Sequence, residues 1–304
     1  MYCQRVRNVV AIAIYLVAVF AGAALMAPFA WKAVFADWAF LGFLSDHDDF
    51  HRYFNRCLML LAIGGLVVLW KAMKIESWKE LGWVPASGNG ASLGQGLALG
   101  IASLAAVAAL ALIFGAREFN ANPTMAMWGK HMLNTLGAAI AVGILEETIF
   151  RGMLFNLLRR DLNWRTAAAV SAVIFASVHF MDQRPDIQTI TWTTGFTAFP
   201  QFIHDFANDP YWPAYYVNLL LAGLILSASV VKSGNLYCAI GIHAGWIIAL
   251  KTNGFLTHPT GTSVWWGADK TNDAWMATPL LLGITWFMFK GDAPDLGTTD
   301  SERD

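Results

Sequence analysis

The chain has 304 residues, of which 57% are hydrophobic and 13% are charged, and its formal net charge is -1. Soluble domains are about 25% charged, so this composition predicts an integral membrane protein and excludes an ordinary soluble enzyme. The lack of a strong positive charge also argues against nucleic acid as a partner.

Three apolar runs occupy the N-terminal part of the chain. The first, residues 9–28, follows two arginines and has about the length of a membrane-spanning helix. A cleaved signal peptide is the alternative, and we favour a retained helix. The second and third runs are residues 53–70 and 93–115, and Gly96 and Gly100 in the third predict a close approach of another backbone.

The fourth apolar run contains the residues that are most costly to place in a membrane. Its motif at 144–152, ILEETIFRG, holds Glu146, Glu147 and Arg151. An ionised side chain at a helix centre costs about 2.5–3.5 kcal/mol on insertion scales. Because apolar residues resume after the motif, we expect one helix over 134–158 with the glutamate pair in its interior.

The remaining apolar runs predict four more spanning helices, at residues 166–180, 215–231, 236–250 and 274–289. Between the first two of these, the loop 181–214 is rich in aromatic residues spaced three and four apart. This spacing predicts a short amphipathic segment in the membrane interface, which acts either as an anchor or as a lid. The predicted fold is therefore all-α and polytopic, with about eight transmembrane helices.

The predicted organisation has three parts. Residues 1–133 supply the first three helices and their loops, residues 134–250 a catalytic core on helices 4, 5 and 7, and residues 251–304 the last helix and a polar tail. The segments on the side of the N-terminus hold the larger share of lysine and arginine. The positive-inside rule therefore predicts that both termini are cytoplasmic.

Three ionisable residues on three helices are predicted to lie at one membrane depth. At a rise of 1.5 Å per residue, Glu146, His179 and His243 are about 20, 21 and 17 Å from the predicted inner ends of their helices. The hydrocarbon core is about 30 Å thick, so the three side chains can meet within it. Glu147 and Arg151, four residues apart, share a helix face and are expected to pair, whereas Glu146 is turned about 100° away, towards the histidines.

These side chains suit the hydrolysis of a peptide bond. Glu146 is predicted to act as the general base that activates a water molecule. His179 and His243 have two alternative roles: they bind a metal ion together with Glu146, with zinc expected from the ligand types, or they assist the water and the oxyanion without a metal. A proton-coupled transporter is a rival class, because carboxylates and histidines at this depth also form proton relays.

The motifs resemble those of the CPBP intramembrane proteases, which include CAAX proteases and bacteriocin-processing (Abi) proteins. Residues 146–151 match the family's E-E-x-x-x-R motif, and Phe175 and His179 match its F-x-x-x-H motif. His243, with the Gly-Asn-Leu sequence before it, resembles the third motif. The resemblance covers residues 134–250.

The resemblance implies a metallo- or glutamate-type intramembrane endopeptidase of the bacterial cytoplasmic (inner) membrane. Its substrate would be a membrane-embedded or lipid-anchored peptide. The implied catalytic residues are Glu146, His179 and His243, which are also the candidate zinc ligands, and the supporting residues are Glu147, Arg151 and Phe175. The family has Asn or Asp four residues after the last histidine, where this chain has Ile247. The alternative is therefore a catalytically inactive scaffold or immunity protein, unless Asn218 or Asn253 replaces the missing side chain.

Overall fold

The computed structural model describes residues 7–33, 50–121, 123–180, 189–268 and 271–291. The helices are α1 (Arg7–Lys32), α2 (Phe50–Ala72), α3 (Gly90–Ile113), α4 (Met125–Glu147), α5 (Asn156–Asp161), α6 (Trp164–Phe180), α7 (Thr194–Asn208), α8 (Trp212–Ser233), α9 (Tyr237–Leu256) and α10 (Thr278–Phe289). Two three-residue strands, β1 (Arg117–Phe119) and β2 (Thr257–Pro259), pair antiparallel. The predicted all-α class is confirmed.

Each of the apolar runs coincides with a helix. Within the described ranges, four helices are long and apolar enough to cross a membrane, namely α1, α2, α3 and α8. The last apolar run forms a shorter helix over Trp275–Phe289. The number of eight transmembrane helices stays a prediction.

The chain forms two compact units, residues 1–75 with 177–210 and residues 76–176 with 211–304. The parts 1–133, 134–250 and 251–304 are divisions along the sequence, and they stay a prediction.

In the first unit, α1 packs against α2 and α7 packs against α1. The Tyr15 hydroxyl donates a hydrogen bond to the carbonyl oxygen of Ala62 at 2.9 Å. A Cβ atom at Gly195 would overlap the backbone of Ala24, so this glycine lets α7 approach α1. The predicted amphipathic segment of the loop 181–214 corresponds to α7, whereas residues 181–188 lie outside the described residues.

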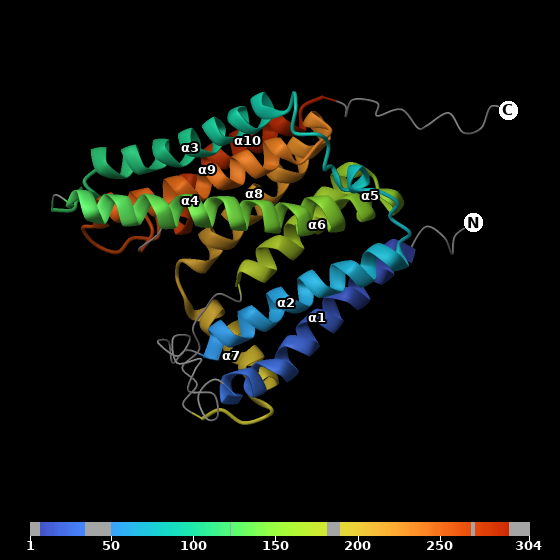
Figure 1. The fold of residues 1–304 in the computed structure, drawn as a ribbon. Helices are drawn as coiled ribbons and strands as arrows, with labels where there is room; N and C mark the ends of the chain where they lie inside the picture. Colours follow the sequence, from blue (N-terminus) through green and yellow to red (C-terminus); the bar gives the residue numbers. More distant parts are fainter. Residues whose placement is uncertain (1–6, 34–49, 122, 181–188, 269–270, 292–304) are drawn as a thin grey trace. The chain divides into compact units, whose positions relative to one another are not determined.

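In the second unit, α9 packs against α3, α4 and α8, and α10 packs against α8 (Figure 1). The contact between α3 and α9 is made backbone to backbone. Gly96 and Gly100 of α3 face Gly241 and Gly245 of α9, and a Cβ atom at Gly100 would overlap the carbonyl oxygen of Ile242. The close approach predicted from the two α3 glycines is therefore confirmed, and its partner is α9.

The glutamate pair lies inside a continuous helical rod. Helix α4 passes directly into the π-helical segment Thr148–Phe155, and this segment passes into α5. The junction residues Glu147, Thr148 and Asn156 all have right-handed helical dihedral angles. Helix α4 begins at Met125, earlier than the sequence predicted. π-Helical turns within α-helices are rare and occur frequently at functional sites.

Candidate active site

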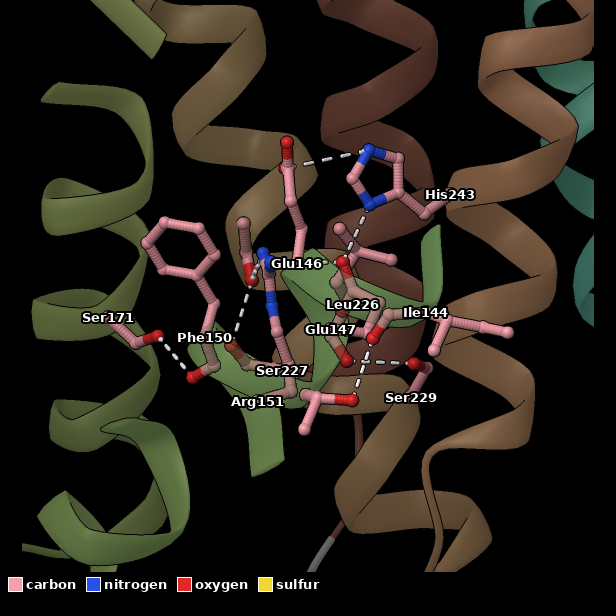
Figure 2. Close-up of polar contacts among 12 residues, drawn as sticks. Ile144, Glu146, Glu147, Phe150, Arg151, Ser171, Leu226, Ser227, Ser229 and His243 are labelled. Carbon is pink, nitrogen blue, oxygen red and sulfur yellow. Dashed lines mark hydrogen bonds and ion pairs between the residues drawn. The ribbon is translucent and has the colours of Figure 1, made fainter. Parts of the chain in front are cut away.

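Four ionisable side chains meet within the second unit, contributed by α4, the π-helical segment and α9 (Figure 2). Glu147 Oε1 accepts a hydrogen bond from Arg151 Nη1 at 3.1 Å and lies 2.7 Å from His243 Nδ1. On the other side of the ring, His243 Nε2 lies 3.9 Å from Glu146 Oε2. One imidazole therefore lies between two adjacent carboxylates.

The contact between Glu147 and His243 was not predicted. The sequence paired Glu147 with Arg151, which the structure shows, and directed only Glu146 towards His243. The structure brings both carboxylates to the same ring: the two glutamates are about 100° apart around the axis of α4, and each approaches a different ring nitrogen. No signal in the sequence reports this contact, since it depends on how α9 is rotated against α4.

Burial distinguishes the two glutamates. The side chains of Glu147 and Arg151 are 0% exposed, whereas that of Glu146 is 24% exposed. An unpaired charge at a fully buried position costs several kcal/mol, so Glu147 needs the guanidinium beside it. Since a carboxylate oxygen accepts hydrogen bonds, the contact at 2.7 Å favours the tautomer of His243 with hydrogen at Nδ1. Of the two carboxylates, Glu146 has the surface that can meet water or a substrate.

Phe175 of α6 packs against both Arg151 and His243 of the cluster. Its ring centroid is 4.3 Å from the Arg151 guanidinium carbon and 6.2 Å from the His243 ring, which it meets edge to face. Arg151 Nη2 also donates to the carbonyl oxygen of Gly223 on α8 at 3.4 Å. The guanidinium is therefore enclosed by α6 and α8, and the predicted supporting residue Phe175 is in contact with the cluster.

His179 is the penultimate residue of α6. It belongs to the first compact unit, whereas the glutamate–histidine cluster lies entirely in the second. Because four residues make about one helical turn, His179 is on the same face of α6 as Phe175. Its role in catalysis stays a prediction.

Two of the expected zinc ligands are present in the cluster. Within the described part of the chain, no three His, Cys, Asp or Glu side chains form a group that could hold a metal ion. Glu146 Oε2 and His243 Nε2 nevertheless face each other, and the other ring nitrogen of His243 contacts a carboxylate. A carboxylate at the second ring nitrogen is usual for metal-binding histidines, so this pair is chemically suited to supply two zinc ligands.

The two asparagines that were considered as replacements at position 247 are engaged elsewhere. Asn218 Nδ2 donates to two carbonyl oxygens of the segment 271–274, both at 3.0 Å. Asn253 Nδ2 donates to a threonine hydroxyl of the same segment at 2.7 Å. In the structure both amides bond to this segment, and their role as a replacement at position 247 stays a prediction.

The comparisons with known proteins agree with the motifs. Residues 128–249 match the family model described as type II CAAX prenyl endopeptidase Rce1-like. This range includes Glu146, His179 and His243, and the match confirms the resemblance to CAAX-type intramembrane proteases. The comparisons with curated proteins and with solved structures find no match.

Proposed function

We propose that this chain is an intramembrane endopeptidase that hydrolyses a membrane-proximal peptide bond with water activated by Glu146. The proposal is supported above all by the contact of His243 with both glutamates, within the segment that matches the CAAX-type proteases. The substrate is a membrane-embedded or lipid-anchored peptide. The protein crosses the bacterial cytoplasmic membrane with about eight helices, and both termini are cytoplasmic.

In the proposed reaction, Glu146 takes a proton from a water molecule, whose oxygen attacks the carbonyl carbon of the scissile bond. The C–N bond then breaks as the proton passes from Glu146 to the amine nitrogen. His243, held at Nδ1 by Glu147, presents Nε2 beside Glu146 and keeps this side of the site in a fixed geometry.

His179 is the third proposed catalytic residue, because it ends the F-x-x-x-H motif within the segment that matches the family model. It acts in one of the two ways that the residue types allow: as a donor to the oxyanion, or as the third zinc ligand. Zinc, when bound, would polarise the substrate carbonyl and lower the pKa of bound water.

The buried pair Glu147–Arg151 has a proposed orienting role that can be separated from its structural one. Arg151→Met leaves a buried carboxylate without its cation and should lower the free energy of unfolding by about 3–5 kcal/mol. The double variant Glu147→Leu/Arg151→Met should regain the thermal midpoint and yield, because apolar pairs of similar volume often replace buried ion pairs without loss. Its cleavage rate should stay about 10- to 100-fold below wild type, because His243 Nδ1 has lost its acceptor.

Thermal unfolding in detergent and peptide cleavage by the same preparations measure the two roles. If the double variant regained both stability and wild-type cleavage, Glu147 would be a structural residue only.

A test of the function is the incubation of detergent-purified protein with a panel of membrane peptides, including peptides with a prenylated C-terminus. We expect cleavage products whose termini, read by mass spectrometry, lie close to the membrane boundary. Parallel reactions with a zinc chelator, and with zinc added back, assign the role of the histidines: inhibition that zinc reverses assigns metal binding, and unchanged rates assign the metal-free role.

A catalytically inactive scaffold or immunity protein is the second candidate, and it is favoured by Ile247. The variant Ile247→Asn in the same assay discriminates between the two. An inactive wild type that gains cleavage on this substitution would identify a degraded site, whereas a wild type that already cleaves as fast as the variant rules out the scaffold.

A further inference from the structure

Three exposed cations surround the last turn of α10 in the second unit. Lys232, at the end of α8, donates from Nζ to the carbonyl oxygen of Phe287 at 3.4 Å. Arg165, at the start of α6, donates from Nη2 to the carbonyl oxygen of Gly291 at 3.2 Å. Lys290 follows the helix directly. The three side chains, called the basic rim below, therefore come from α6, from α8 and from the residue after α10, and they lie around one helix end.

Each cation of the basic rim lies over an aromatic ring. Lys232 Nζ is 5.3 Å from the centroid of the Phe287 ring, Lys290 Nζ is 5.0 Å from that of Trp286, and the Arg165 guanidinium carbon is 4.9 Å from that of Trp164. The rings of Trp286 and Phe287 are themselves 66% and 65% exposed. Exposed aromatic rings beside lysine and arginine at the end of an apolar helix are typical of the membrane–water interface.

Among the described residues, no carboxylate compensates the charge of the basic rim. Arg165, Lys232 and Lys290 form no ion pair with a carboxylate within the described ranges. Two of the cations do satisfy free carbonyl groups at the C-terminal end of α10, which a helix end favours. Such a contact uses one donor, whereas a lysine has three and an arginine five. All three side chains are exposed, and the interfacial rings beside them would place their remaining donors near the phosphate groups of lipids.

We propose that the basic rim binds the phosphate group of an anionic lipid. Clusters of lysine and arginine at helix ends recognise such headgroups, with about 1 kcal/mol of attraction per basic residue near an anionic surface. The aromatic rings beneath the cations would contact the glycerol and upper acyl region of the same lipid. The site requires an embedded protein but no hydrolysis, so it stands or falls independently of the proposed function.

The test compares thermal unfolding of the full chain in nanodiscs of phosphatidylcholine alone and in nanodiscs that also contain phosphatidylglycerol. For wild type we expect the anionic lipid to raise the midpoint by about 3 °C or more, as a ligand of the native state does. The variant Lys232→Gln/Lys290→Gln should lose most of this difference, and Arg165→Gln should reduce it. A purely structural role of the basic rim would lower the midpoint equally in both lipids and leave the difference unchanged, which would overturn the proposal.

The matched control is Lys130→Gln/Lys251→Gln, which removes the same charge. Lys251 is near the C-terminal end of α9, whereas Lys232 is at the end of α8, which leads into the start of α9. The control should keep the wild-type difference between the lipids, and its loss there too would indicate a general charge effect instead of a site. Inorganic phosphate alone is a further probe in detergent. If it stabilised the wild type but not the Lys232→Gln/Lys290→Gln variant, the ligand of the basic rim would be a soluble anion and not a lipid.

The acidic residues after position 291 are the rival occupant. A chain that ends at Gly291 should show the same lipid difference as the full chain. If the midpoint differed between the two lipid compositions only after this truncation, the tail would occupy the basic rim in the full chain. That result would overturn the lipid assignment.

Discussion

Replacing Glu146 with glutamine should reduce peptide hydrolysis by about 10³-fold, within the range that a general base contributes. The amide has nearly the same volume as the carboxylate but cannot accept a proton from water. Because Glu146 is 24% exposed and lies 3.9 Å from His243 Nε2, the substitution should leave the thermal midpoint close to that of wild type. The loss should appear in kcat and not in KM, since the proton is taken only in the transition state.

Glu118→Gln is a matched control for this substitution, because Glu118 is an exposed glutamate on β1 in the same unit. It should cleave like wild type. His243→Gln and His179→Gln should also lose most of the activity if both histidines act in the site. If Glu146→Gln retained more than about a tenth of the wild-type rate, Glu146 would not be the general base.

Alanine at Gly100 or Gly245 should strongly destabilise the second unit. A Cβ atom at Gly245 would lie 2.6 Å from the carbonyl oxygen of Leu97 and 2.9 Å from the amide nitrogen of Ile101, and one at Gly100 would overlap the backbone of Ile242. Backbone atoms cannot move aside as a side chain can, so α3 and α9 must separate. Overpacking of this kind costs about 1–3 kcal/mol per site, and the double variant should lower the midpoint by about 5 °C or more.

Cleavage should fall together with stability in these variants, because α9 carries His243, which contacts Glu147 at 2.7 Å. Gly94→Ala on α3 and Gly254→Ala on α9 are matched controls, since an added Cβ atom meets nothing within 4 Å at either position. There alanine should be neutral or stabilising by up to about 1 kcal/mol, as its helix propensity predicts. Equal midpoints for Gly100→Ala and Gly94→Ala would show that the close contact of α3 and α9 does not limit stability.

The sequence predicted where the helices lie more accurately than it predicted their first and last residues. Apolar runs of the length of a bilayer locate helices reliably, because burial in lipid requires every backbone group to be bonded within its segment. The boundaries were less predictable: α4 begins at Met125 instead of near residue 134, since polar residues also continue a helix beyond its apolar part. The π-helical segment Thr148–Phe155 was not predicted, because its apolar composition is the same as that of an α-helix.

For the site, the sequence by itself determined what depends on neighbours along one helix. The pairing of Glu147 with Arg151 and the shared face of Phe175 and His179 follow from a spacing of four residues. The family motifs could be read from the same short segments, and these lie within residues 128–249, which match the family model. The deviation at Ile247 was likewise visible in the sequence alone.

Only the tertiary structure decided how these local pieces meet. It joined His243 to both Glu146 and Glu147, and it engaged Asn218 with a distant segment instead of the site. Such contacts depend on the rotation and separation of elements that are 56 to 96 residues apart in sequence, and no helical period encodes these. In this protein the separation between α3 and α9 follows from glycines on both helices, because only a residue without a side chain lets two backbones touch.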